Sequence, residues 1–420
     1  MARANTSDPA ARMIECDVAV VGAGPAGLTA ALALAHMGAR TVCAGPPFNP
    51  NPERPDTRTT ALLRGSVQLL RNIGVWPYCV AEAAPLDAIR IIDDTGRLLR
   101  APEVVFRADE LGLEAFGFNV PNHALVAALR KRGAELADLE LIETSGAQAV
   151  KPGAKAIEVD LGGDGTIRAR LVAGADGRKS MCRQAAGIGT FGWGYDQSAI
   201  ACNFQHSASH GNVSNEFHNP AGPFTTVPLP GNASSLVWVE RPAAVERLMG
   251  FSDKTIAEEL EHRLQGMLGR IEGVGPRAAF PLSGLTARGL ARSRIALIGE
   301  AAHVIPPIGA QGLNLGFRDA AHLAELVGRS LDRGQDPGGW QLLQAYDRSR
   351  RGDVVGRTLA VDLLNRSLLS GFLPLQIARG FGLHLLNALS PLRRFVMRQG
   401  LDAESELPNL MRPQPRLTAA

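Results

Sequence analysis

The stretch DVAVVGAGPAGLTAALALA, Asp17 to Ala35, decides the fold of this chain. A run of β-branched residues enters the pattern G-x-G-x-x-G, and a segment rich in Ala and Leu, typical of a helix, follows it. In this pattern Gly22 permits a tight turn, Gly24 lets the backbone approach a pyrophosphate, and Gly27 lets the helix pack on the strand. An ordinary strand–turn–helix is the simpler explanation, but this context near the start of the chain predicts dinucleotide binding.

A second stretch, IALIGEAAHVIPPIGAQGLNLG at Ile295 to Gly316, predicts the other half of a cofactor site. An apolar strand leads into a turn, a Pro-Pro break and two glycines, and then into a helix whose early positions include Asn314. The free N–H groups at a helix start favour negative charge above them. Together with the N-terminal glycine pattern, this loop indicates a flavin.

One part of the dinucleotide fingerprint is missing after the second strand, Arg40 to Ala44. An acid that bonds a ribose hydroxyl is expected about twenty residues after the first glycines. The chain has Gly45-Pro-Pro47 at that place. We therefore expect another residue to hold the ribose, or the loop from Phe48 to Asp56 to fold over it.

Three further segments resemble motifs of the FAD-dependent aromatic-ring monooxygenases. The first, Asp56 to Leu62, lies where those enzymes carry an arginine for the pyrophosphate, here Arg58. The second, Leu171 to Ser180, resembles their D-G motif, in which the acid meets FAD, here Asp176-Gly177. The third, Gly299 to Asn314, resembles the segment that contacts the FAD ribose and the flavin ring.

The tail narrows this resemblance to one group of enzymes. With Asp362 to Leu369 and Leu373 to Gln376, the chain is similar to the ubiquinone-biosynthesis FAD-dependent hydroxylases, the prenylphenol monooxygenases. The likeness runs from Asp17 to about Gly400 and rests on several separate motifs. The chain departs from the family pattern at two residues. Glu300 stands where the family has the aspartate of a G-D pair, and His123 stands where many relatives have arginine.

The glycine pattern and the resemblance together imply a set of residues around a non-covalent FAD. No catalytic base is assigned, and the flavin-facing loop with Pro307, Gly309 and Gln311 is the candidate for the chemistry. The predicted cofactor-binding residues are Gly22, Ala23, Gly24, Pro25, Ala26, Gly27, Arg58, Asp176, Gly177, Glu300, Pro307, Gly309, Ala310, Gln311, Gly312, Leu313 and Asn314.

The reaction that the resemblance implies needs few side chains. FAD accepts a hydride from an external reductant, with NAD(P)H expected, and reacts with O2 to a flavin hydroperoxide that hydroxylates the ring of a polyprenylated phenol. Reduced flavin is anionic, so the amides around Gly309 to Gly312 would stabilise it. A dry pocket is needed because water would release peroxide.

Two other functions stay open at this point. The first is a flavin oxidoreductase that hydroxylates another aromatic compound, or reduces or halogenates its substrate, although the W-x-W-x-I-P signature usual in halogenases is lacking. The second is a non-catalytic flavin-binding subunit of a quinone-biosynthesis complex. The mass of the product distinguishes the other flavin oxidoreductases from a prenylphenol hydroxylase. Oxidation of the reductant that depends on substrate and is coupled to an oxygenated product distinguishes a prenylphenol hydroxylase from a non-catalytic subunit.

The composition is typical of a cytoplasmic or membrane-peripheral enzyme. A length of 420 residues exceeds one ordinary core and predicts two lobes. The net charge of +3, without a Lys/Arg block, predicts no nucleic-acid partner. Five scattered cysteines without C-x-x-C argue against a disulfide framework and a zinc site, and for a reducing compartment. The first fifteen residues lack the apolar core of a signal peptide, so we expect a cytoplasmic protein, at most peripheral at the inner face of the membrane.

The order of predicted elements gives a mixed α/β fold: a Rossmann-like FAD-binding domain, an interleaved antiparallel-sheet substrate domain and C-terminal helices. Asp17 to Gly45 predicts β-α-β, and the chain after Asn314 predicts helices almost to Leu401. The predicted FAD domain comprises 1–80, 119–188 and 285–345, the substrate domain 81–118 and 189–284, and the helical region 346–420. Other predicted elements are a helix at Ser66–Leu70, a hairpin at Ile89–Leu99, a helix at Asn122–Arg132, strands at Leu139–Ile142, Ala156–Leu161, Ile167–Val172, Ala199–Phe204, Val213–Phe217, Phe224–Pro228 and Ser235–Val239, and a return at Ala278–Pro281.

Several polar and aromatic residues have an ordinary structural interpretation. His303 follows a strand and is expected to orient the loop or to pack, not to act as a base. Arg318 and Asp319 predict a structural ion pair. Three histidines of the substrate sheet lack ligand spacing, so we predict no metal site: His206, His210 and His218. Four aromatic residues are candidates to line a substrate pocket, although each has core packing as its ordinary role: Trp193, Tyr195, Trp238 and Phe280.

The tail from Leu359 to Arg398 combines many apolar residues with five arginines. Its structural interpretation is a helical cap on the FAD domain. Its functional interpretation is a membrane-facing surface whose arginines meet anionic head groups and which guides a prenyl tail to the pocket. Pro374 and Pro391 exclude one continuous span. The arginines are Arg366, Arg379, Arg393, Arg394 and Arg398.

Overall fold

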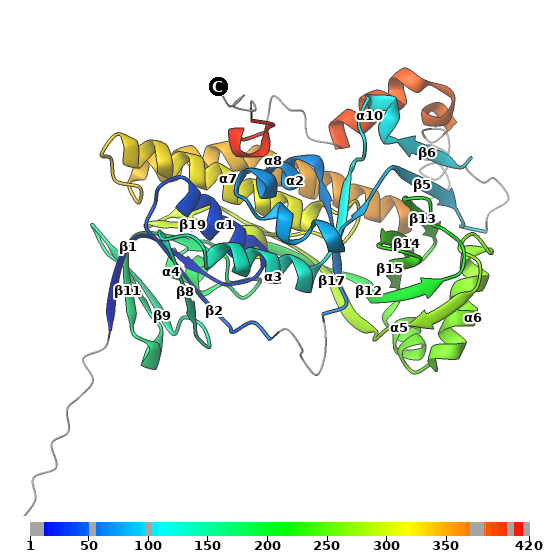
Figure 1. The fold of residues 1–420 in the computed structure, drawn as a ribbon, viewed down its shortest axis with the longest axis horizontal. Coiled ribbons are helices and arrows are strands. Elements are labelled where there is room, and N and C mark those ends of the chain that lie inside the picture. Colours follow the sequence, from blue (N-terminus) through cyan, green and yellow to red (C-terminus); the bar gives the residue numbers. More distant parts are fainter. Residues whose placement is uncertain are drawn as a thin grey trace, which may run out of the picture.

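Two large β-sheets lie beside one another in the computed structural model, and a layer of long helices covers the first of them (Figure 1). The structure describes residues 12–49, 56–96, 102–369, 382, 384–400 and 407–414. The predicted mixed α/β fold is confirmed.

The first sheet has a parallel centre of five strands, which gives it a carboxyl edge where their ends gather. Their order is β19 (Ile295–Leu297), β11 (Thr166–Gly174), β1 (Met13–Val21), β2 (Thr41–Gly45) and β8 (Leu139–Glu143). Three antiparallel strands flank this centre: β9 (Ala149–Pro152), β10 (Ile157–Asp160) and β18 (Ala291–Arg292). The loops that leave the carboxyl edge hold most of the predicted cofactor residues, as expected for parallel sheets.

The helix that follows the glycine pattern, α1 (Pro25–His36), is buried along almost its whole length. It packs between the sheet and the helices α3 (Asn122–Gly133) and α7 (Gln311–Asp332) (Figure 1). An Ala- and Leu-rich helix without a polar face suits such a place, because no side of it needs water. Helix α8 (Trp340–Leu369) lies against α7. The predicted β-α-β unit is confirmed, as is the helix predicted at Asn122–Arg132.

The second sheet carries its own core on one face. Buried residues of β12, including Ile200 and Phe204, pack with Trp238 against the helices α5 (Pro242–Met249) and α6 (Asp253–Leu264). The strands are β5 (Ala88–Asp93), β6 (Val104–Arg107), β12 (Thr190–His206), β13 (Val213–Asn219), β14 (Gly222–Leu229), β15 (Ala233–Glu240), β16 (Ile271–Val274), β17 (Ala278–Ala287) and β20 (His303–Val304). The opposite face contacts the segment that begins at Thr59, since Ser235 accepts a hydrogen bond from the Thr59 hydroxyl at 3.0 Å.

Two strands of this sheet extend well past their predicted ends. The strand predicted at Ala199–Phe204 is the 17-residue β12, and the return predicted at Ala278–Pro281 is the first part of β17. The two strands pair along most of their length, with an irregularity between Gly194 and Ser198. Glycine-rich sequence concealed the early part of β12, because glycine normally weakens a strand prediction.

The first strand of the hairpin predicted at Ile89–Leu99 is confirmed as β5, whereas its predicted second strand lies outside the described residues. β5 pairs with β6 in antiparallel and with β13 in parallel register. At the predicted turn, Thr95 donates a hydrogen bond from its hydroxyl to Asp93 at 2.6 Å. Residues 97–101, which include Leu99, lie outside the described part.

A small third sheet and the helix α2 (Arg64–Asn72) connect the two lobes. Its strands are β3 (Thr59–Leu63), β7 (Gly117–Pro121) and β4 (Ala84–Pro85). Helix α2 contains the helix predicted at Ser66–Leu70 and packs against a short turn at Asn409–Met411. The helix predicted at Ser66–Leu70 is thus confirmed, whereas the predicted domain ranges stay a prediction.

The described part of the C-terminal region contains the helices α8 and α10 (Ser390–Gly400) and the short turn at Asn409–Met411. Among the described residues, no helix combines the length and the apolar run that crossing a membrane needs. Several predicted tail residues, Phe372, Leu373, Ile377, Arg379 and Phe381 among them, lie outside the described residues.

Candidate functional site

The glycine turn after β1 closes tightly against protein at two of its glycines and opens at the third. Gly22 has φ +113°, and a Cβ there would lie 2.3 Å from the carbonyl oxygen of Ala175. A Cβ at Gly27 would lie 1.9 Å from the carbonyl oxygen of Gly22. A Cβ at Gly24, by contrast, would meet no heavy atom within 4 Å. The turn therefore leaves open space only at the glycine that the pattern assigns to a phosphate.

The missing acid at the end of β2 has a steric reason. A Cβ at Gly45 would lie 2.5 Å from the backbone nitrogen of Ala23, so no side chain fits there. The nearest acid in register is Glu143 on β8, which pairs with Gly45 across the sheet. Its carboxylate is half exposed and lies 2.8 Å from Arg130, which also donates to the Pro46 carbonyl.

The flavin-loop candidate, residues 307–312, ends in an uncapped helix start. Gly309 and Ala310 both have positive φ, +65° and +53°, and no side chain caps the first amides of α7. Pro307, Gly309 and Gly312 are exposed, and a Cβ at Gly312 would meet no heavy atom within 4 Å. Helix α1 also begins without a side-chain cap. Free amides at two helix starts favour an anion above them.

These helix starts belong to one packed unit. A Cβ at Gly316 would lie 3.4 Å from the Cβ of Ala26 and 3.3 Å from the Cα of Gly299. Ala26 stands in the first turn of α1 and Gly316 in the second turn of α7. The glycine turn, the Gly299–Glu300 loop and α7 therefore pack closely through backbone and methyl groups.

The side chain of Asn314 ties the flavin-loop candidate to the small sheet. Its amide nitrogen donates to the carbonyls of Ala61 at 2.8 Å and Ala310 at 2.6 Å. Its amide oxygen accepts from the backbone nitrogen of Leu63 at 2.9 Å. Leu313, next to it, is half-buried against the core. A contact of either residue with the cofactor stays a prediction.

The D-G motif is held by its own turn. Asp176 accepts hydrogen bonds from the Ser180 hydroxyl at 2.5 Å and from the amide of Cys182 at 3.0 Å, at the start of α4 (Met181–Ala185). Gly177 follows with φ +78°. Buried Arg183 donates to the carbonyl of Ala301 at 2.8 Å, which joins this motif to the next loop. No sequence pattern predicted this connecting role of Arg183, apart from its place beside the D-G motif.

Two charged residues that were predicted to bind FAD, Arg58 and Glu300, form ion pairs within the protein. Arg58 makes a bidentate pair with Asp56, both distances 2.8 Å, and its hydrogen bond to that carboxylate raises the pKa of Arg58. Glu300 pairs with Arg178 at 3.2 Å, and both side chains are about half exposed. The predicted functions of Arg58 toward a pyrophosphate and of Glu300 toward a ribose stay predictions.

His303 lies in β20, buried, as expected of a residue that orients the loop. Its Nε2 is 2.7 Å from Asp319, whose same oxygen accepts from the amide of Gly299 at 3.1 Å. The predicted pair between Arg318 and Asp319 is wrong, because Arg318 pairs with Asp353 on α8 at 2.7 Å. Consecutive residues of a helix do not face each other, so each finds a different partner.

The aromatic candidates do not form one wall. Trp238 lies in the core under α6, on the opposite face of the sheet from Tyr195. Trp193 donates to the Tyr195 hydroxyl at 2.6 Å, and Tyr195 donates to Asp362 at 2.5 Å. Burial, assisted by Asp362, raises the pKa of Tyr195 to about 12. Phe280 is partly exposed and lies under Arg58.

The three histidines of the second sheet make hydrogen bonds within the protein. His206 contacts the Ala208 carbonyl and the Ser234 hydroxyl, and His218 lies 2.7 Å from Glu216. His210 contacts the Leu229 carbonyl at 2.9 Å. Within the described ranges, no group of three His, Cys, Asp or Glu side chains is placed to hold a metal ion.

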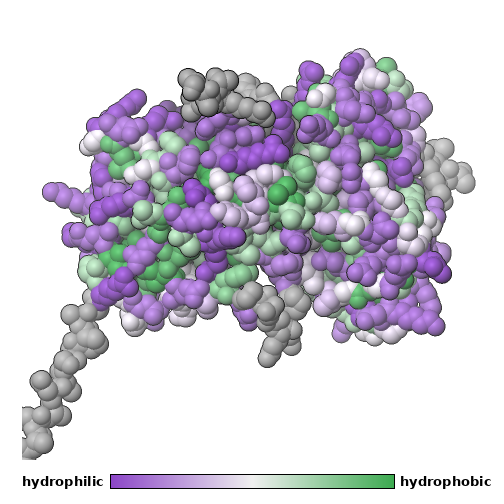
Figure 2. Space-filling model, in the orientation of Figure 1, coloured by the Kyte–Doolittle hydropathy of each residue, from purple (hydrophilic) through white to green (hydrophobic). Residues whose placement is uncertain are grey.

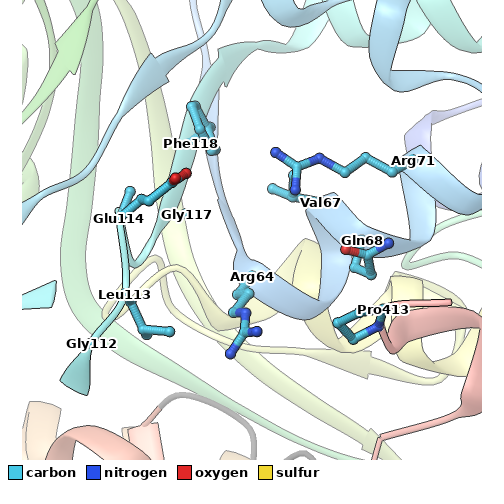
Figure 3. Close-up of a pocket in the computed structure, with 11 residues that line it drawn as sticks. Arg64, Val67, Gln68, Arg71, Gly112, Leu113, Glu114, Gly117, Phe118 and Pro413 are labelled. Atoms are coloured by element: carbon cyan, nitrogen blue, oxygen red, sulfur yellow. The ribbon is translucent and has the colours of Figure 1, made fainter. Parts of the chain in front are cut away.

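A cavity of about 360 Å³ lies beside α2 (Figure 3). Arg64 and Arg71 line it from the helix, and Glu114 and Phe118 line it from the facing segment. In Figure 3 the guanidinium of Arg71 and the carboxylate of Glu114 point into the space between them. None of the predicted cofactor residues lines this cavity, so it is separate from the glycine turn.

Comparisons with known proteins agree with this arrangement. The protein-family model described as "FAD binding domain" matches residues 15–359. Ubiquinone hydroxylase UbiL of Rhodospirillum rubrum is 35% identical over 407 residues, which cover 95% of this chain and 93% of the relative. The 3-demethoxyubiquinol 3-hydroxylase of Escherichia coli is 31% identical, with 92% and 98% covered.

Solved structures share the fold at lower identity. The p-nitrophenol 4-monooxygenase PnpA of Pseudomonas putida matches with a TM-score of 0.75 and 20% identity, over 92% of this chain and 98% of that one. The flavin-dependent monooxygenase PieE, solved with FAD and substrate, matches with a TM-score of 0.67 and 20% identity, over 94% and 73%.

We expect Gly24→Val and Gly27→Val to fail in different ways. At Gly24 the new side chain meets no protein atom, so the fold should stay intact while FAD affinity falls about tenfold to a hundredfold from overpacking against the pyrophosphate. At Gly27 the side chain meets the backbone of Gly22, so the protein itself should lose stability. FAD content and thermal unfolding of both variants measure this. Wild-type FAD retention in a folded Gly24→Val protein would contradict the placement of the phosphate.

Proposed function

This chain belongs to the FAD-binding aromatic-ring monooxygenases, and from that premise we propose that it hydroxylates the ring of a polyprenylated phenol in ubiquinone biosynthesis. The observation that carries the proposal is the pair of uncapped helix starts, each with a glycine whose missing side chain leaves open space. The full-length similarity to two enzymes named for ubiquinone chemistry supports the choice of substrate.

The residues at the sheet edge fit FAD. The start of α1 with Gly24 suits the pyrophosphate, because its amides are free and the space above it is open. The start of α7 suits the flavin, because a helix N-terminus stabilises the negative charge of the reduced ring. When bound, FAD supplies the electrons for O2 and the transfer of one oxygen atom to the substrate.

The protein's own contribution is to place the ring and to keep water away from it. Ile308 is buried between exposed neighbours, and it therefore anchors the loop to the body of the protein. Asn314 fixes the loop's end to β3. We propose NAD(P)H as the external reductant. We also propose that the loop excludes water, so that oxygen would be transferred to the substrate and not released as peroxide.

Gly312→Val tests whether the flavin ring lies over the start of α7. The added side chain meets no protein atom, so we expect FAD to stay bound while product per NAD(P)H falls severalfold and peroxide rises. Gly352→Val is the matched control, since Gly352 is another exposed helical glycine with no heavy atom within 4 Å of its Cβ. Full coupling with a prenylated phenol in both variants would show that the loop does not face the ring.

We also propose that α10 rests on a membrane surface, which would give access to a lipid substrate. Leu392, Phe395 and Val396 are exposed on this helix, and hydrophobic residues interrupt the hydrophilic surface where it lies (Figure 2). Exposed Arg394 and Arg398 flank them. An apolar face with basic flanks is the pattern of an interfacial helix. Arg393 was expected to join them, but its guanidinium is turned inward onto Glu110 at 2.8 Å.

Sedimentation with anionic vesicles tests this surface. Arg394→Glu combined with Arg398→Glu should weaken binding by at least about tenfold, since each basic residue near such a surface contributes roughly 1 kcal/mol. Binding of the wild type should fall as salt rises. Lys151→Glu with Lys155→Glu makes the same charge change on the exposed β9–β10 turn and should bind like the wild type. If the α10 variant binds equally well, or the wild type does not bind, the helix is only structural.

A further inference from the structure

A chain of buried charges joins α7 to α8 behind the cofactor loops. Asp319 and Arg350 are each 1% exposed, and the Nε of Arg350 donates to Asp319 at 2.8 Å. The Nη1 of Arg350 donates to Asp353 at 2.7 Å, and Arg318 donates to the same carboxylate at 2.7 Å. The Nε of Arg357 donates to the second oxygen of Asp353 at 2.7 Å. Burying such groups is costly unless each is matched, so their presence calls for a reason beyond stability.

Each end of this chain of charges reaches a different loop of the cofactor site. At one end Asp319 accepts from the amide of Gly299 at 3.1 Å. At the other end the Nη1 of Arg357 donates to the side-chain oxygen of Gln311 at 2.7 Å. Gln311 is the first residue of α7, and its side-chain nitrogen donates to the Gly309 carbonyl at 3.0 Å. One continuous set of hydrogen bonds therefore spans the Gly299–Glu300 loop and residues 309–311.

The carboxylates of this set stay ionised at neutral pH. Burial alone would raise the pKa of Asp353, but the guanidiniums of Arg350, Arg318 and Arg357 outweigh it and hold the pKa well below its usual range. The pKa of Asp319 is lowered in the same way, against burial, by His303 and Arg350. Charged hydrogen bonds of this kind are short and directional, which suits them to fix a geometry.

The turn at Gly309 and Ala310, at the Arg357 end of this chain of charges, needs contacts that fix its geometry. Gly309 and Ala310 both adopt left-handed backbone conformations, and Ala310 does so with a side chain. That conformation is unfavourable for a residue with a side chain, so surrounding contacts must hold it. Asn314 binds the Ala310 carbonyl at 2.6 Å, and Gln311 binds the Gly309 carbonyl. Only Gln311 is in turn held by a charged residue of another helix, Arg357.

We propose that Arg357 is a positioning residue for the flavin: anchored by Asp353, it orients Gln311 and so fixes the strained turn that presents the first amides of α7 to the ring. The inference rests on the proposed function, because it assumes that the flavin lies over this turn. It makes the reactivity of the cofactor depend on a side chain that belongs to α8 and not to the cofactor loops.

A second arginine–aspartate pair on α8 serves as a comparison for Arg357 and Asp353. Arg351 pairs with Asp347 four residues earlier, at 2.7 Å, with the spacing of Arg357 and Asp353. Arg351 is half exposed, and within the described part of the chain its partner beyond Asp347 is the Arg288 carbonyl. The two pairs have the same local geometry, and only one extends to the flavin-loop candidate.

The test measures the flavin without any substrate. Arg357→Met leaves Asp353 bound to Arg350 and Arg318, so the protein should fold and retain FAD. At a fixed solution potential set with redox dyes, we expect the ratio of reduced to oxidised flavin to fall about three- to tenfold, the range expected for a disturbed helix-start interaction. Gln311→Leu should shift the ratio in the same direction, and Arg351→Met should not shift it.

Arg357→Lys separates position from charge. Lysine keeps the positive charge but lacks the planar fork that reaches Asp353 and Gln311 together, so its ratio should stay close to that of Arg357→Met. A wild-type ratio in Arg357→Met, an equal shift in Arg351→Met, or full recovery in Arg357→Lys would overturn the proposal. Failure to hydroxylate a prenylated phenol would contradict only the substrate, and failure of the wild type to bind FAD would contradict the proposed function itself.

Discussion

The site depends on backbone contacts at the carboxyl edge of the parallel sheet, where there is no room for side chains. Gly27 meets the carbonyl of Gly22, Gly22 meets Ala175, and Gly316 meets Ala26 and Gly299. These contacts bring the starts of α1 and α7 to one edge of the sheet. An anionic cofactor is favoured there because neither helix start has a side-chain cap, and because a Cβ at Gly24 or Gly312 would meet no heavy atom within 4 Å.

The polar groups around this edge mostly hold the loops. Asp176 caps its own helix, Arg183 joins the D-G motif to Ala301, and Asn314 joins the flavin-loop candidate to β3. Asp319 holds the Gly299 amide from behind. Polar groups that hold loops suit a reaction whose chemistry resides in the cofactor. The protein then positions the cofactor, excludes water and supplies electrostatic stabilisation. It also explains why no pair of acid and base stood out in the sequence.

What could be predicted followed from local signals. The glycine turn, the β-α-β unit and the helix at 122–133 depend on neighbours in sequence, and each lies where it was expected. Contacts between distant segments gave no such signal. The length of β12 depends on its pairing with β17, and β5 pairs with β13, which lies more than a hundred residues later in the sequence. The steric exclusion at Gly45 depends on Ala23 in another turn. The function of Arg357 depends on which helix lies beside α7, which spacing on α8 does not reveal.

Isotope labelling of the product tests the central claim most directly. The purified protein with FAD, NAD(P)H and a prenylated phenol should yield a product that carries one oxygen atom from ¹⁸O₂, read as a mass increase of the ring fragment. Product labelled from water would contradict oxygen transfer from O2 to the ring, and consumption of NAD(P)H and O2 without any labelled product would contradict the prenylated phenol as the substrate.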